Sequence, residues 1–174
     1  MYRGKISPAM FAIVLSVALT ACGYHFKGAG LKAPEGVHTI AITMLENRTS
    51  ESGIERVFTN DLIYEFTRSK VLRVEDKSMA DSVLSGTIKS MGVHTISHTA
   101  DYDSGERRVT IGLSLTLKSR DGKVLWSDAA LSDKEEYKVL PDNRIATDRN
   151  RRVAIEAISE RLAERTHNRI LTGF

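Results

Sequence analysis

What this sequence lacks excludes several classes of protein. It has one cysteine, Cys22, so no disulfide can form within a single chain. After residue 21 no apolar run approaches the roughly 20 residues that a membrane-spanning helix needs. Internal repeats and low-complexity tracts are missing as well. The formal net charge is only +3, which gives no indication of a nucleic-acid partner.

Motifs of the common enzyme classes are also missing. The sequence contains no nucleophile elbow, P-loop or zincin motif. His94 and His98 would share a face of a strand but lie about 13 Å apart, too far for one zinc ion. The acidic segment with Asp101, Asp103 and Glu106 lacks the spacing of a calcium loop and is predicted to be a solvated turn. We therefore expect no catalytic residue, no metal site and no enzymatic activity.

The first 22 residues have the pattern of an export signal. Arg3 and Lys5 form a basic start, and residues 10–19 form an apolar run too short to cross a bilayer. Leu19-Thr20-Ala21-Cys22 then resembles the lipobox of bacterial lipoproteins, in which the cysteine thiol is acylated and becomes the new N-terminus. The alternative is an ordinary signal peptide with a cysteine nearby by chance.

Lipidation would fix the location of the protein. Several acyl chains on one residue hold a protein stably in a membrane, whereas one holds it only marginally. Gly23, rather than an acidic residue, follows the cysteine, which implies transfer to the periplasmic side of the outer membrane. We predict a cleaved signal peptide over residues 1–21, a lipidated tether over 22–35 and a single domain over 36–174. No cofactor is expected beyond the covalent acyl groups on Cys22.

The rest of the chain predicts an α+β fold. Strands are expected at residues 36–44, 71–74, 80–97, 109–117 and 123 to about 131. Between the first two strands, a helix is expected to start after a Ser52 cap and to end near Arg68–Lys70. A second helix is expected over residues 146–171. The predicted architecture is a mainly antiparallel, four- to five-stranded twisted sheet with both α-helices packed on one face.

Several local features sharpen this prediction. Residues 109–117 alternate strictly between apolar and polar, which indicates one buried and one wet face. Asp121-Gly122 is a hairpin signal, and Gly86 and Gly92 mark a bulge or a close backbone approach. Residues 46–53 and 132–145 are predicted to be polar loops. The helical positions expected to face the core are Ile54, Val57, Phe58, Leu62 and Phe66 in the first helix, and Val153, Ala157, Ile158, Leu162 and Ile170 in the second.

Two basic clusters are candidate binding sites. Arg149, Arg151 and Arg152 lie at the start of the last helix, and Arg107-Arg108 open the long alternating strand. Guanidinium groups bind phosphate through paired hydrogen bonds, so these residues are candidates for an anionic partner such as phosphorylated lipid headgroups. A solvated surface is the alternative.

Three stretches together resemble the LptE family, the lipoprotein partner of the outer-membrane lipopolysaccharide translocon. The first is Cys22-Gly23-Tyr24-His25-Phe26. The second is Ile40-Ala41-Ile42 followed by Glu46-Asn47-Arg48-Thr49, Gly53-Ile54-Glu55 and Thr59-Asn60-Asp61-Leu62. The third is Ala80-Asp81-Ser82-Val83-Leu84-Ser85-Gly86-Thr87-Ile88, which leads to Gly122-Lys123-Val124-Leu125-Trp126. The likeness spans nearly the whole mature chain. Arg107 and Met44 depart from the family pattern.

The resemblance implies a plug in the lumen of the LptD β-barrel that supports barrel assembly and lipopolysaccharide transfer to the outer leaflet. The implied partners are an LptD-like barrel, lipopolysaccharide and, through the lipid anchor, the membrane; nucleic acid is not among them. The candidate lipopolysaccharide-binding residues are Arg149, Arg151, Arg152, Arg107 and Arg108. A strand followed by a turn like that at residues 46–49 also occurs in lipoproteins that activate a periplasmic cell-wall synthase or belong to other envelope complexes. The start at Cys22–Phe26 favours the plug over that alternative.

Overall fold

The computed structural model describes residues 32–98 and 105–173, within the second of the two units into which the chain divides, residues 31–174. The predicted signal peptide and Cys22 lie outside the described residues. The described chain begins inside the segment predicted to be a tether. There the Lys32 amide donates to the Leu171 carbonyl oxygen at 2.8 Å, and Pro34 is buried.

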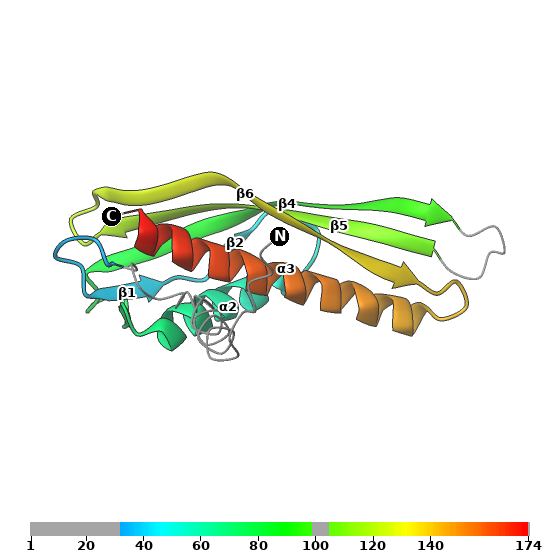
Figure 1. The fold of residues 1–174 in the computed structure, drawn as a ribbon, viewed down its shortest axis with the longest axis horizontal. Coiled ribbons are helices and arrows are strands. Elements are labelled where there is room, and N and C mark those ends of the chain that lie inside the picture. The colour runs from blue at the N-terminus through cyan, green and yellow to red at the C-terminus, as the bar shows by residue number, and fades with distance from the viewer. Residues whose placement is uncertain (1–31, 99–104, 174) are drawn as a thin grey trace, which may run out of the picture. The chain divides into compact units, whose positions relative to one another are not determined.

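The described residues form an open, mixed sheet with two helices (Figure 1). The elements are β1 (Thr39–Ile42), β2 (Glu46–Asn47), α2 (Ile54–Ser69), β3 (Arg73–Val74), β4 (Ser82–His98), β5 (Gly105–Ser119), β6 (Val124–Val139) and α3 (Arg144–Thr172). The strand order is β3-β1-β4-β5-β6, with β2 beside β4. β1 runs parallel to β3 and β4, while β4, β5 and β6 are antiparallel. The α+β prediction is confirmed, with six strands instead of four or five.

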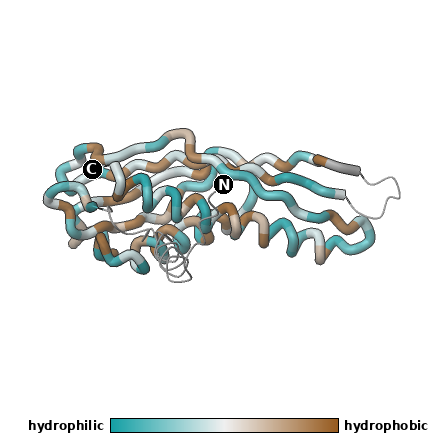
Figure 2. The backbone as a smooth tube through the Cα atoms, viewed as in Figure 1, coloured by the Kyte–Doolittle hydropathy of each residue, from teal (hydrophilic) through white to brown (hydrophobic). Residues whose placement is uncertain are grey.

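Both helices cover the same face of the sheet. On β5 the odd-numbered apolar residues Val109 to Leu117 are buried, and the polar residues between them are half-buried, as the alternation predicts. α3 packs along β6 and β5, while α2 packs over β1, β2 and β3 and against α3. Hydrophobic and hydrophilic residues accordingly alternate along the elements (Figure 2). The opposite face of the sheet is covered by no element among the described residues.

The two helices run in the same direction and are joined by aromatic and polar contacts. The Ser159 hydroxyl donates to the Asp61 carboxylate, and the Phe66 and His167 rings meet edge to face with centroids 5.1 Å apart. Four of the five predicted positions, Ile54, Phe58, Leu62 and Phe66, are buried, which confirms the core stripe of α2, whereas Val57 is only half-buried.

Two predictions about the helices are wrong. Val153 was expected in the core but is 56% exposed, because the neighbouring Ala154 and Ile155 face the sheet instead. α2 has no side-chain cap at Ser52. Its cap residue is Gly53, at φ 89°, whose amide is bound by the Glu55 carboxylate at 3.0 Å. Glycine tolerates that left-handed backbone without the steric cost that a side chain would bring.

Two segments expected to be loops are strands. Glu46–Asn47 pairs with Thr87 and Ile88 of β4, and β6 continues to Val139 rather than ending near Leu131. Their polar composition is typical of loops, so they were not predicted to be strands. The acidic residues of β6 are neutralised by arginines of α3, as described below. Gly86 is a site of close backbone approach, as predicted, but the register shifts of β4 fall at Lys89 and Ile96 rather than at the glycines.

Candidate functional site

The basic cluster at the start of α3 is divided between a structural contact and an exposed surface. Arg151 binds the Glu51 carboxylate through two hydrogen bonds of 2.8 and 3.1 Å, which tie α3 to the loop before α2. Arg149 and Arg152 are exposed and have no ion-pair partner within residues 32–98 and 105–173. Two of the three predicted arginines therefore remain available to an anionic ligand.

Arg107 and Arg108 lie on opposite faces of the sheet, because successive side chains of a strand alternate. Arg108 is paired across the sheet with Glu136, at 2.5 Å, on the uncovered face. Arg107 is exposed on the helix-covered face, where its register partner on β6 is Tyr137. Since α3 contacts the same part of β6 through Asn150, whose side chain donates to the Lys138 carbonyl oxygen, the two basic clusters share one end of the domain.

A second set of arginines, outside the two candidate clusters, binds β6. Arg161, Arg165 and Arg169 are spaced four residues apart and therefore form one stripe along α3. Arg161 bonds Asp133 at 2.7 Å and Glu135 at 2.8 Å, while Arg169 pairs with Asp128. The periodicity of these arginines was visible in the sequence, but their acidic partners lie in a segment predicted to be a loop.

The same stripe also protects the outer edge of β6. Arg161 and Arg165 donate to the carbonyl oxygens of Lys134 and Ser132, at 3.1 and 2.9 Å. With the Asn150 contact, three side chains of α3 occupy carbonyl groups that an edge strand otherwise leaves unpaired. This edge of the sheet is thereby closed to a further strand.

Asp133 is the charged centre of the stripe. Burial raises the pKa of this carboxyl, but the hydrogen bonds from Arg161 and the Lys134 amide, together with the positive charges of Arg161 and Arg165, hold the pKa below its ordinary value. The hydrogen bond to Asp133 raises the pKa of Arg161. A carboxylate with a lowered folded-state pKa stabilises the fold above its unfolded pKa of about 3.9, and that contribution is lost as the pH falls through the folded value.

Arg161→Ala is expected to lower the free energy of unfolding at pH 7 by about 1–2 kcal/mol, since it leaves the partly buried Asp133 carboxylate with only the Lys134 amide and the longer contact to Arg165. The variant should also lose less stability than the wild type between pH 6 and pH 3. Urea unfolding at several pH values measures both effects. Arg152→Ala, which removes an exposed arginine from the same helix, is the control. Equal stability of the two variants at neutral pH would contradict this role.

The loop between β2 and α2 is ordered by the side chain of Asn47. Its amide nitrogen donates to the Glu51 carbonyl oxygen and to the Glu55 carboxylate, at 2.7 and 2.9 Å, and its oxygen accepts from the Thr49 amide and hydroxyl. The Asn47 side chain at the end of β2 therefore orders the loop that leads to α2. This loop presents Glu51 to Arg151.

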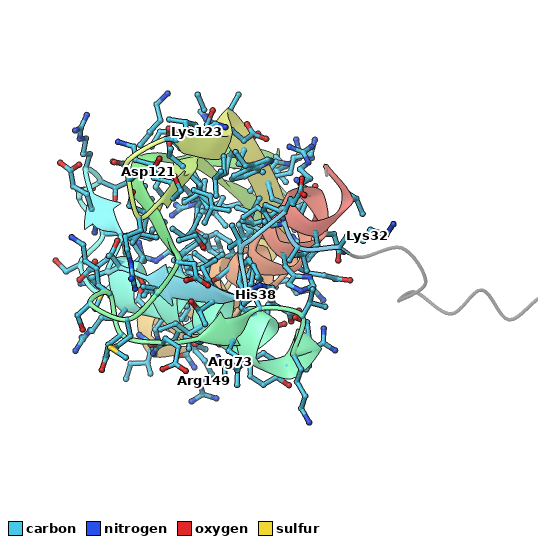
Figure 3. All side chains as sticks on the ribbon, turned by 90° about the vertical axis from the view of Figure 1, so that its left-hand side faces the viewer. Lys32, His38, Arg73, Asp121, Lys123 and Arg149 are labelled. Carbon is cyan, nitrogen blue, oxygen red and sulfur yellow. The ribbon has the colours of Figure 1, made fainter. Side chains whose placement is uncertain are left out.

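The opposite end of the domain holds an open hollow of about 530 Å³ beside the β5–β6 hairpin. Figure 3 looks onto this end and shows Asp121 and Lys123 on the hairpin, with His38 below them. The Asp81 carboxylate accepts from the His38 and Thr39 amides, both at 3.0 Å. The His38 bond and those of Thr39 lower the pKa of Asp81. Since this carboxylate is occupied by the start of β1, it fastens β1 to β4.

The described residues offer little for metal chemistry or membrane insertion. No group of three His, Cys, Asp or Glu side chains within them is arranged to hold a metal ion. None of the helices in the described part is long and apolar enough to cross a membrane.

Comparison with known families identifies the domain. The LptE family of lipopolysaccharide-assembly proteins matches residues 37–170, from just before β1 to the end of α3. The chain belongs to the LptE family. It is therefore a lipopolysaccharide-assembly protein of a family that is not enzymatic. A comparison with curated proteins finds no match.

Solved structures share the fold of this LptE-family protein at low sequence identity. The solution structure of uncharacterized lipoprotein B from Nitrosomonas europaea is 11% identical, with a TM-score of 0.57, and the match covers 87% of this chain and 92% of that one. A minor lipoprotein from Acinetobacter baumannii is 13% identical, with a TM-score of 0.51, and the match covers 79% and 93% of the two chains. The fold of the LptE-family domain thus recurs in other bacterial lipoproteins.

Proposed function

We propose that this LptE-family protein is an outer-membrane lipoprotein, anchored by acyl groups on Cys22, that plugs an LptD-like β-barrel. In this role it helps to assemble the barrel and supports the transfer of lipopolysaccharide to the cell surface. The observation that carries the proposal is the family match over residues 37–170, which includes all six strands.

The uncovered face of the sheet supports this placement. Its central strands present small and hydroxyl side chains, among them Ser85 and Thr87 of β4 and Thr110, Ser114 and Thr116 of β5. The wall of a large outer-membrane barrel is polar on its inner side. A polar sheet face fits such a wall without burying unpaired apolar surface, and hydroxyl groups supply both donors and acceptors to it.

The test is co-purification of the full-length lipoprotein with an LptD-like barrel in mild detergent. We expect a stable complex of the two proteins. Recovery of a periplasmic cell-wall synthase without any large outer-membrane barrel would contradict the plug and favour the adaptor role.

Lipopolysaccharide is expected to bind at the end of the domain that carries Arg149 and Arg152. Replacing both Arg149 and Arg152 by glutamate should weaken binding of purified lipopolysaccharide by about ten-fold or more at low salt, because two donors to phosphate become repulsive charges. Arg151 and Arg108 are held by Glu51 and Glu136, so their replacement is expected to reduce stability as well.

The matched control reverses the same number of charges at the opposite end of the domain. Arg73 and Lys123 are both exposed at that end: Arg73 stands opposite Thr39, whose amide binds Asp81, and Lys123 lies in the β5–β6 hairpin. Their double replacement by glutamate should leave binding within about two-fold of the wild type, since distant surface charges are screened at moderate salt. Equal affinities of the two double variants, measured by surface plasmon resonance, would refute a specific site.

A further inference from the structure

The two edges of the antiparallel part of the sheet differ in whether other parts of the domain occupy them. The edge of β6 is occupied by side chains of α3, as described above. The other edge belongs to β4, which pairs with β1 through residues 82–84 and with β2 through Thr87 and Ile88. From Lys89 to His98 the described residues place no strand on this side of β4, as the right-hand part of Figure 1 shows.

This open edge lacks the charged residues and prolines by which many proteins protect an edge strand, and register shifts interrupt it only at Lys89 and Ile96. Residues 90–98 contain no lysine, arginine, aspartate, glutamate or proline. Val93 and Ile96 are each 41% exposed, which is high for apolar side chains in a strand. The open edge is roughly 30 Å long at 3.3 Å per residue. Such an uncharged edge with exposed apolar side chains is a template for pairing with another chain.

The direction of the backbone groups along the open edge follows from the register. The Leu84 and Ile88 carbonyl oxygens accept from the Thr43 and Arg48 amides, so these residues of β4 point their polar groups away from β5. They stand opposite Leu117 and Leu113.

In an antiparallel pair, outward and inward positions alternate along the strand. The residues of β4 opposite Ile111, Val109 and Arg107 are therefore also outward. These are Met91, Val93 and Thr95.

The charges around the open edge indicate what binds there. Arg107 lies on β5 directly beside Thr95, on the same face, and is exposed. β4 contains no aspartate or glutamate along its whole length, so pairing with the β4 of a second copy would supply no partner for Arg107. The described chain starts at Lys32, beside Leu171 at the far end of α3 from this edge. A separate polypeptide that carries an acidic residue fits this edge better than a second copy of the chain or the segment that precedes Lys32.

We infer that residues 90–98 of β4 accept an extended segment of another polypeptide as an additional strand. The segment contributes main-chain hydrogen bonds to Met91, Val93 and Thr95, apolar or β-branched residues beside Val93, and an acidic residue that reaches Arg107. In the complex proposed above this polypeptide is the barrel, so the inference rests on the proposed function. Strand addition of this kind derives affinity from the main chain and specificity from alternate side chains.

Val93→Pro tests the inference directly. Proline removes the outward N–H of Val93 and leaves the hydrogen bonds between β4 and β5 in place, so the domain should keep its circular dichroism spectrum. Val93→Thr retains the N–H and the branched shape and is the matched control. We expect recovery of the barrel with full-length Val93→Pro to fall about five- to ten-fold relative to the wild type, and recovery with Val93→Thr to stay within two-fold.

Amide hydrogen exchange provides the second readout. The amides of Met91, Val93 and Thr95 should exchange at least ten-fold more slowly in the wild-type complex than in the isolated lipoprotein. If Val93→Pro fails to fold, Ile96→Lys places a strongly hydrated charge on the same edge, which disfavours burial against an added strand, and it is expected to show the same loss of recovery.

The outcomes separate the inference from the proposed function. Failure of the wild type to recover any barrel would overturn both. Undiminished recovery with Val93→Pro, together with unprotected amides in the complex, would overturn the strand addition and leave the plug intact. Protection of these amides in the isolated protein would also overturn it. In that case a concentration-dependent dimer would assign the edge to a second copy, and a monomer would assign it to the chain itself.

Discussion

Replacing Gly86 by alanine is expected to reduce the free energy of unfolding by about 2–3 kcal/mol, a large part of the stability of a small domain. A Cβ atom at this position would overlap the carbonyl oxygen of Ser114 and a methyl group of Leu115. Gly86 stands opposite Leu115 in the register. The Leu115 side chain, which is fully buried, fills the space that a side chain at position 86 would need.

The strain at Gly86 cannot be relieved cheaply. The overlapping oxygen belongs to the backbone of β5, which is held between β4 and β6. Moving β5 would disturb both ladders and the packing beneath Leu115. Close-packed interiors transmit such a shift rather than absorb it.

Gly92→Ala is the matched control in the same strand. The nearest atom to a Cβ there is the His94 Nε2, at 3.3 Å, at the end of a side chain that can rotate. The control is expected to change stability by about 0.5 kcal/mol or less. Urea unfolding of the two unlipidated variants, followed by circular dichroism, measures the difference. Equal unfolding midpoints of the Gly86→Ala and Gly92→Ala variants would show that β5 shifts at a lower cost in free energy than its central position indicates.

Replacing Cys22 by alanine is expected to remove the protein from the outer membrane. Each methylene of a buried acyl chain contributes about 0.8 kcal/mol, so loss of several chains abolishes stable attachment. No helix among the described residues is long and apolar enough to replace the anchor. We expect the variant in the soluble periplasmic fraction, or held in the inner membrane by an uncleaved signal peptide.

Gly23→Asp is the control for the anchor. It retains Cys22 and therefore acylation, but places an acidic residue directly after the cysteine, which is expected to hold the lipoprotein in the inner membrane. Fractionation of the two membranes and mass spectrometry of the mature N-terminus distinguish the variants. Normal outer-membrane recovery of Cys22→Ala would contradict lipidation at this residue.

The sequence predicted those structural features that depend on interactions between neighbouring residues. It did not predict those that depend on contacts between residues far apart in the chain. The alternation of residues 109–117 predicted the buried face of β5, because side chains of a strand point alternately to its two faces. The Asp121-Gly122 turn, with Gly122 at φ 89°, follows from the backbone preferences of adjacent residues, and the end of α2 near Lys70 was predicted from the cations of its last turn. Each of these features needs no knowledge of distant parts of the chain.

The extension of β6 shows where local reasoning failed. Residues 132–139 are mostly charged, which is typical of a loop in an isolated sequence. They form a strand because Arg161 and Arg165, about 30 residues later, neutralise Asp133 and occupy the edge carbonyl groups. Burial of these charges costs little once they are paired.

The candidate binding site was likewise predicted in part from local sequence and in part only from the tertiary structure. The sequence identified Arg149, Arg151 and Arg152 near the start of α3, but Arg151 is separated by 100 residues from the Glu51 that binds it. Nothing near either residue in the sequence predicts that contact. The arginines available to a phosphate ligand could be chosen only after the packing of α3 against the loop before α2 was known.

By itself, therefore, the sequence determined the fold class, the faces of the central strand, the family resemblance and the cysteine proposed as anchor. Each depends on short-range periodicity or on a contiguous motif. The tertiary structure decided which charges are paired, that the edge of β6 is closed and that the distal edge of β4 is open. These depend on contacts between residues far apart in the chain, whose free energies arise only when the helices pack on the sheet.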